Sequence, residues 1–164
     1  MPVPSEAAKL GEASSYDEVF SIVKSHVESV LGLHRAGLTM GLTSLPASVG
    51  AFHVLGSNFI VLNKALLQRV NGEEPKEIVN SLLYMLLLHE YLHSLGILGE
   101  EEVRRTSAEV AERMLGKGHP ASMLITQPMN RLFPYIEALH SEGQFEGEVE
   151  IVKGFDSKSY PFIS

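Results

Sequence analysis

The chain contains no cysteine, which excludes disulfide bonds and the thiolate ligands of zinc knuckles. Any metal ion must therefore be held by histidine, aspartate or glutamate. Basic residues are also scarce, because 13 Lys and Arg stand against 20 Asp and Glu, for a formal net charge of −7. A chain without a basic surface is poorly suited to contact phosphates, so we expect no nucleic-acid partner.

Long apolar segments are absent as well. The longest uninterrupted apolar run covers residues 82–88, whereas a transmembrane helix needs about 20 residues. The first residues show neither the basic start nor the apolar core of a signal peptide. We therefore expect a cytoplasmic protein that does not associate with membranes.

What remains is a chain of one domain's length, with 164 residues of which 45% are hydrophobic. We predict a single domain over residues 1–164, in which residues 1–14 form a flexible lead-in and residues 154–164 a tail. Helical spacing of apolar residues predicts a helix from Ser15 to Gly32.

Strands are predicted near residues 38–42, 51–55 and 59–62, where apolar residues alternate or form short β-rich runs. Turn residues at 56–58 join the last two strands into a hairpin. Asn63 can then cap a short helix that runs to Val70.

Two longer helices follow, over residues 75–95 and 100–115, with a tight turn between them. The first is apolar around nearly its whole circumference, which places it in the centre of the domain. A short helix near 135–140 and a strand near 149–152 complete the prediction. The fold class is α+β: a short, mostly antiparallel sheet with a hairpin, packed on a buried helix and a following antiparallel helix.

Chemistry is concentrated in residues 89–93 of the buried helix, which read His-Glu-Tyr-Leu-His. His89 and His93 are four residues apart, a rotation of about 40° on a helix, so both imidazoles project from one face. One zinc ion can bridge them. Glu90 is rotated about 100° away and is better placed to act as a general base on water than as a ligand.

The segment His89-Glu90-Tyr91-Leu92-His93-Ser94-Leu95-Gly96 on a buried helix after strands resembles the zincin class of metallopeptidases. This resemblance implies a zincin-like domain that binds one zinc ion through His89 and His93. It also implies hydrolysis of peptide or protein substrates, with Glu90 activating water. In zincins a strand beside the cleft pairs with the substrate backbone, and the matching element here is residues 51–55 or its hairpin partner.

Such a site needs a third protein ligand. Metzincins carry a further histidine where this chain has Gly99, so that solution fails. Gluzincins take a glutamate from the next helix, and this chain supplies three at its start. If the two helices fold back symmetrically about their turn, Glu102 faces His93, so we predict Glu102 as the third ligand. The alternatives are Glu109, Glu100 and Glu101, and after these glutamates His119.

The residue that stabilises the oxyanion stays open among Tyr135, His140, Arg104 and Arg105. His53 in its strand is positioned to face the cleft. Two other functions compete with a zinc peptidase. One is a metal-binding regulator or interaction module without turnover, and the other is a metal-dependent endoribonuclease, which the acidic charge and Gly99 argue against.

Overall fold

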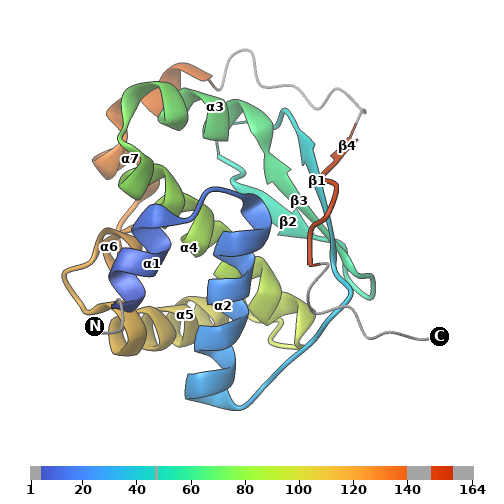
Figure 1. Cartoon of the computed structure of the whole chain (residues 1–164). Helices are drawn as coiled ribbons and strands as arrows, with labels where there is room; N and C mark the ends of the chain where they lie inside the picture. Colours follow the sequence, from blue (N-terminus) through green and yellow to red (C-terminus); the bar gives the residue numbers. More distant parts are fainter. Residues whose placement is uncertain (1–4, 47, 140–148, 157–164) are drawn as a thin grey trace.

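The structure is a computed structural model that describes residues 5–46, 48–139 and 149–156. Within these residues there are seven α-helices, one 3₁₀ helix and four strands (Figure 1). In chain order they are α1 Glu6–Glu12, α2 Tyr16–Leu31, β1 Thr39–Thr43, β2 Ala51–His53, β3 Phe59–Asn63, α3 Lys64–Glu73, α4 Lys76–Ser94, α5 Glu100–Leu115, α6 Pro120–Thr126, α7 Met129–Leu132, the 3₁₀ helix Pro134–Leu139 and β4 Glu150–Ile151.

The four described strands form one mixed sheet in the order β2-β3-β1-β4. The predicted hairpin is confirmed, since β2 and β3 pair antiparallel, as do β1 and β4. The central pair, β1 with β3, is parallel, so the sheet is mixed. After β1 the chain first makes β2 at the edge and then returns through β3, which brings β3 alongside β1 in the same direction. Figure 1 shows the sheet along one side of the molecule and most of the helices on the other.

Helix α4 lies at the centre of the domain, as its sequence predicts. It contacts five helices, α1, α2, α3, α5 and α6, and the strands β2 and β3. Tyr84, Leu87 and Leu88 have no exposed surface. Among the described residues, no helix is both long and apolar enough to cross a membrane.

Local signals in the sequence set several helix ends correctly. Ser15 accepts a hydrogen bond from the Glu18 N–H at the start of α2, and Gly32 ends that helix in a left-handed conformation. Asn63 caps α3 by accepting from the Leu66 N–H. Helix α5 runs from Glu100 to Leu115 with Gly116 after it, so these helix predictions are confirmed.

The N-terminal segment differs from the predicted flexible lead-in. Residues 6–12 form α1, capped by the Ser5 side chain, and Leu10 is 1% exposed in the core. The Asn80 amide donates to the carbonyls of Leu10 and Ala13. A seven-residue helix is too short to be stable alone, so packing on α4 stabilises it and its local sequence does not reveal it.

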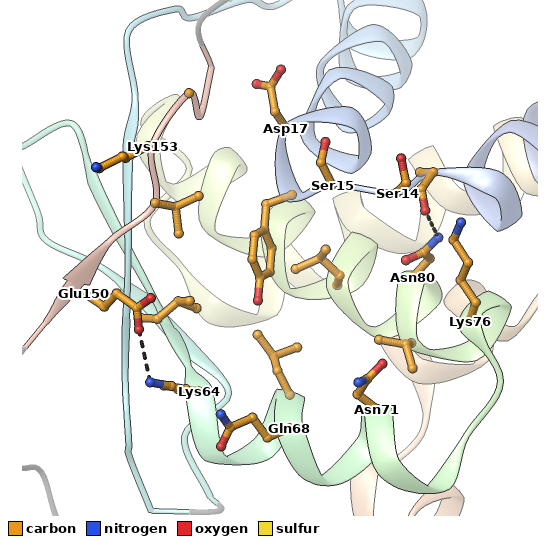
Figure 2. A pocket seen from close by; sticks show the side chains of 18 residues that line it. Ser14, Ser15, Asp17, Lys64, Gln68, Asn71, Lys76, Asn80, Glu150 and Lys153 are labelled. Atoms are coloured by element: carbon orange, nitrogen blue, oxygen red, sulfur yellow. Dashed lines mark hydrogen bonds and ion pairs between the residues drawn. The ribbon is translucent and has the colours of Figure 1, made fainter.

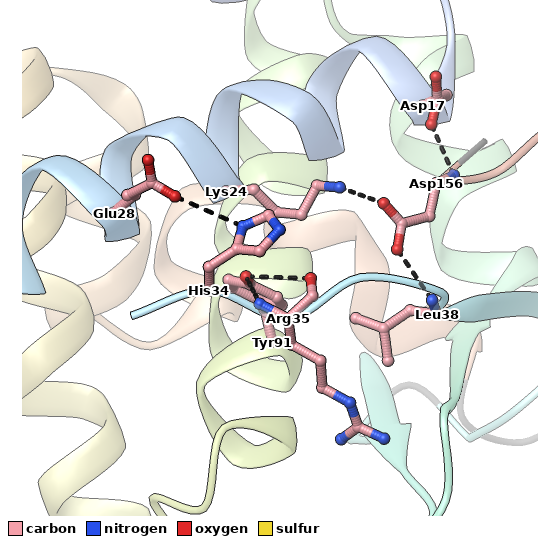
Figure 3. A network of polar contacts seen from close by, with 8 residues as sticks. All are labelled: Asp17, Lys24, Glu28, His34, Arg35, Leu38, Tyr91 and Asp156. Carbon is pink, nitrogen blue, oxygen red and sulfur yellow. Dashed lines mark hydrogen bonds and ion pairs between the residues drawn. The ribbon is translucent and has the colours of Figure 1, made fainter. Parts of the chain in front are cut away.

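The predicted tail, residues 154–164, includes two residues that pack in the domain. Phe155 and Asp156 are buried and join the part of the chain after β4 to the helices. Asp156 forms a buried ion pair with Lys24 of α2, and its other carboxylate oxygen accepts from the Leu38 N–H at 2.8 Å (Figure 3). Its own N–H donates to Asp17 at 2.6 Å. Residues 157–164, the rest of the predicted tail, lie outside the described residues.

Candidate metal centre

The two histidines of the motif lie on one face of α4, where they meet the first residue of α5. His89 Nε2 is 3.1 Å from one carboxylate oxygen of Glu100, and His93 Nε2 is 2.8 Å from the other. Among the described residues, these three form the one group of three or more possible ligands for a metal ion, with their donor atoms all within 4.8 Å of one another. The donor set of two imidazoles and one carboxylate suits zinc.

Glu102, the predicted third ligand, is exposed and lies outside this group. The structure brings Glu100 to the histidines instead, because the turn between α4 and α5 is short and α5 begins at Glu100 itself. Glu102 is rotated by about 200° from Glu100 around the helix, and therefore points away. Val103 and Ser107, which are buried, are three and seven residues after Glu100 and share its face. This buried stripe is the sequence signal that could have identified Glu100.

A hydrogen bond at the ring nitrogen that does not face Glu100 fixes the orientation of His93. Its Nδ1 is 2.8 Å from the Ile97 carbonyl, and since a carbonyl only accepts, Nδ1 carries the proton. In the neutral ring, Nε2 then presents a lone pair to the Glu100 carboxylate, which also presents lone pairs. A cation or an additional proton is needed between these atoms. Donation from the second ring nitrogen to a carbonyl is the usual outer-shell support of a metal-binding histidine.

The three donor atoms lie within 4.8 Å of one another, and each histidine contacts a different oxygen of the Glu100 carboxylate. Burial lowers the pKa of His89, while the nearby Glu100 carboxylate opposes this effect. The neutral form of His89, which has a lone pair for a metal, is therefore favoured.

Glu90 is 5% exposed and, as the residue after His89, is rotated by about 100° from it around α4. Burial raises the pKa of its carboxyl group to about 8, the negative charge of Glu100 adds to this effect, and a hydrogen bond from the His53 backbone opposes it. The hydrogen bond ties the carboxyl group to β2, so both the helix and the sheet determine its position.

A cavity of about 330 Å³ opens at these side chains. Glu90 and all three members of the candidate ligand group line it, together with β2 and two exposed apolar residues, Leu55 and Leu98. Among the described strands, β2 lies at the sheet edge and pairs only with β3, so its outer edge borders the cavity. His53 lines the cavity as predicted, with Nε2 donating to the Ser57 carbonyl at 2.8 Å.

Arg35 fixes the end of α4 against the hairpin. Its guanidinium donates to the Ser94 carbonyl at 2.7 Å and to the Ser57 carbonyl at 3.1 Å. Tyr91, inside the motif, accepts from the Arg35 N–H at 2.8 Å and donates to its carbonyl (Figure 3). These contacts hold the helix that carries the histidines at a fixed distance from the strand that borders the cavity.

The remaining candidates from the sequence lie elsewhere. His119 caps α6 by accepting from the Ala121 N–H, and Glu109 pairs with Arg113 at 3.4 Å. Tyr135 donates to Glu74, and His140 is outside the described residues. Glu101 and Arg105 are exposed and do not line the cavity, whereas Arg104 lines a neighbouring one.

A larger cavity, of about 990 Å³, is a different feature (Figure 2). It lies between the start of α2, α3, the start of α4 and β4, with Lys64 and Glu150 paired across it at 3.0 Å. It contains no histidine and none of the predicted site residues, so size alone does not identify the candidate centre.

No protein-family model matches the chain, and no curated protein or solved structure is significantly similar to it.

Proposed function

We propose that the protein is a zinc-dependent hydrolase of peptide bonds, with His89, His93 and Glu100 as zinc ligands and Glu90 as the general base. The observation that carries the proposal is the contact of one carboxylate with two imidazole Nε2 atoms, at 3.1 and 2.8 Å. With His93 Nδ1 already donating to Ile97, this arrangement is best satisfied by a cation.

When bound, a zinc ion lowers the pKa of water and polarises a substrate carbonyl. Glu90 lines the same cavity as the ligands, and the charge of a bound zinc ion would favour its ionised form. In that form Glu90 would take the proton from the attacking water and deliver it to the leaving amine. Its hydrogen bond from the His53 backbone orients the carboxyl group for this task. Burial at 5% exposure keeps competing solvent away from it.

A peptide is the substrate that the surroundings favour. The outer edge of β2 can pair with an extended backbone by strand addition, next to the candidate ligands. Leu55 is 73% exposed and Leu98 58%, and these apolar side chains at the cavity offer contacts to substrate side chains.

The decisive experiment replaces Glu90 with Gln, which keeps the shape of the side chain and removes the base. We expect the purified variant to retain zinc, measured by elemental analysis, and to lose about 10²- to 10⁴-fold in the rate of hydrolysis of an unstructured peptide library. Glu101→Gln, at an exposed position outside the cavity, is the matched control and should keep both.

Two results would contradict the proposal in different ways. Hydrolysis at the wild-type rate by Glu90→Gln would exclude the general-base role. Zinc in the wild-type protein without hydrolysis of any peptide would instead identify a metal-binding regulator or interaction module.

A further inference from the structure

A second cavity, of about 390 Å³, shares His89 with the candidate metal centre. It lies between α4, α5 and α6 and the turn that leads to α7. Its walls are mostly apolar and include Met85, Leu124, Ile125 and Met129, with Arg104 and Ser107 as polar members. Its volume is near the lower end of the range for small-ligand pockets, and therefore suits one side chain or a peptide end.

The one charged residue in this wall, Arg104, has no partner in hydrogen bonds or ion pairs among the described residues. The expected partner four residues earlier on the same helix face is Glu100. That carboxylate is turned to His89 and His93 instead. Arg104, which is exposed, therefore keeps a guanidinium available at the adjoining cavity.

Ser107 adds a second polar group to the same wall. It is three residues after Arg104, on the same helix face, and its side chain is 1% exposed. Its hydroxyl oxygen is buried without a hydrogen-bond partner among the described residues. An unsatisfied buried hydroxyl is unfavourable, and a ligand with an acceptor group can satisfy it.

We propose that this cavity is a subsite for a carboxylate next to the scissile bond, recognised by Arg104 with support from Ser107. The carboxylate is either that of an acidic side chain or that of the peptide C-terminus. Guanidinium and carboxylate groups pair in a planar, bidentate geometry, while the apolar wall contacts the aliphatic part of the ligand. The role as a subsite rests on the proposed hydrolase function, but binding of the carboxylate does not require turnover.

The test is a titration of the ¹⁵N-labelled full chain, carried out with and without one equivalent of zinc and followed by amide chemical shifts. Three probes differ only in their charges. N-acetylglutamate α-amide carries the side-chain carboxylate, N-acetylglutamine the α-carboxylate, and N-acetylglutamine α-amide neither. We expect at least one carboxylate probe to bind at the amides of the cavity at least about tenfold more tightly than the neutral probe, as expected for a hydrogen bond to a charged group.

Three variants then test which residues cause the tighter binding of the carboxylate probes. Arg104→Gln should abolish it, and Ser107→Ala should weaken it. Arg105→Gln, which makes the same charge change at an exposed neighbour that does not line the cavity, should preserve it. Preference for N-acetylglutamate α-amide would indicate an acidic side chain as the ligand, and preference for N-acetylglutamine would indicate a peptide C-terminus.

Equal binding of all three probes, absence of shifts in the cavity, or equal losses in Arg104→Gln and Arg105→Gln would overturn the inference. Because the titration measures binding and not hydrolysis, its outcome is separate from that of the Glu90→Gln experiment. Zinc-dependent hydrolysis without carboxylate selection would retain the hydrolase and exclude this subsite.

Discussion

Glu100 and Glu102 carry the same side chain on the first turn of α5, but only Glu100 meets the histidines. Replacing Glu100 with Gln should raise the dissociation constant for zinc by at least about tenfold, since even outer-shell partners contribute 10- to 100-fold. Competition with a chromophoric chelator measures this constant. Glu102→Gln makes the same charge change at the same helix end, and is expected to leave zinc affinity nearly unchanged. A larger effect at Glu102 would return the third ligand to that position.

His26 is a buried histidine outside the candidate centre. It is fully buried, with Nδ1 2.7 Å from the Tyr84 hydroxyl and Nε2 2.8 Å from the Glu6 carboxylate. Because the carboxylate accepts from Nε2–H, the tyrosine donates to Nδ1. Burial lowers the pKa of His26, while Glu6 opposes this effect.

The lowered pKa of His26 predicts the sign of a pH effect on stability. The unfolded chain binds a proton at this residue near pH 6.5, whereas the folded chain binds it only at lower pH. The contribution of His26 to the free energy of unfolding is therefore fully present above about pH 6.5. It decreases as the pH falls toward the pKa of His26 in the folded state. In urea unfolding between pH 7.5 and 5.5, His26→Gln should lose less free energy of unfolding than the wild type. Equal slopes for both proteins would contradict this assignment.

The sequence alone indicates part of the candidate site. The spacing of His89, Glu90 and His93 on one apolar helix predicts two ligands and a base, and the structure brings these residues to a common cavity. The third member of the group could not be derived from spacing, because it depends on how a five-residue connection turns the next helix. A symmetric turn favours Glu102, and the actual one presents Glu100.

At the scale of elements, the junction of β3 and α3 depends on one buried side chain. The side-chain oxygen of Asn63, Oδ1, accepts from the N–H groups of Leu66 and Leu45. Its side-chain nitrogen, Nδ2, donates to the backbone carbonyls of Leu45, Pro46 and Val49. Asn63→Asp keeps the helix cap but removes these donors. We expect it to lower the free energy of unfolding by about 1–3 kcal/mol, and Asn63→Ala to add a cap loss of about 1 kcal/mol.

The matched control for this change is Asn58→Asp. Asn58 is exposed, and its amide donates to the Gly37 carbonyl at 2.9 Å. An exposed substitution of this kind should stay within about 0.5 kcal/mol of the wild type. Chemical unfolding of the three variants measures the difference, and equal stabilities of Asn63→Asp and Asn58→Asp would show that Asn63 does not organise the loop.

Elements differ in how well the sequence predicts them, for physical reasons. Helices α4 and α5 have long periodic patterns and clear end signals, so their predicted bounds agree closely with the structure. Helices α1, α6 and α7 have only four to seven residues, and depend on tertiary packing that local sequence does not encode. The parallel pairing of β1 with β3 likewise depends on contacts between distant segments.

At the scale of the whole molecule, Lys24 and Asp156 join the first third of the chain to its last described residues. Their side chains are 5% and 0% exposed. Asp156→Asn keeps the size of the side chain and an oxygen that can accept from the Leu38 N–H, but leaves the Lys24 charge without its partner. We expect a loss of about 3–5 kcal/mol in the free energy of unfolding, the usual effect of removing one member of a buried pair.

A second variant separates the charge from the shape in this prediction. Lys24→Met combined with Asp156→Asn removes both charges, so the double variant should recover most of the stability lost in Asp156→Asn. Urea unfolding of Lys24→Met, Asp156→Asn, the double variant and the wild type provides the comparison. If the double variant loses at least as much free energy of unfolding as the two single variants together, charge compensation is not the main contribution.

The separation of this pair also has a consequence for synthesis of the protein. Lys24 and Asp156 are 132 positions apart, and β4, which pairs with β1, lies just before Asp156. While the chain is still being translated, α2 has no counterion for a lysine that the native fold buries, and β1 has an unpaired edge. The nascent chain therefore keeps Lys24 and this sheet edge without their partners until residues 150–156 have left the ribosome, and this interval is when it depends most on chaperones.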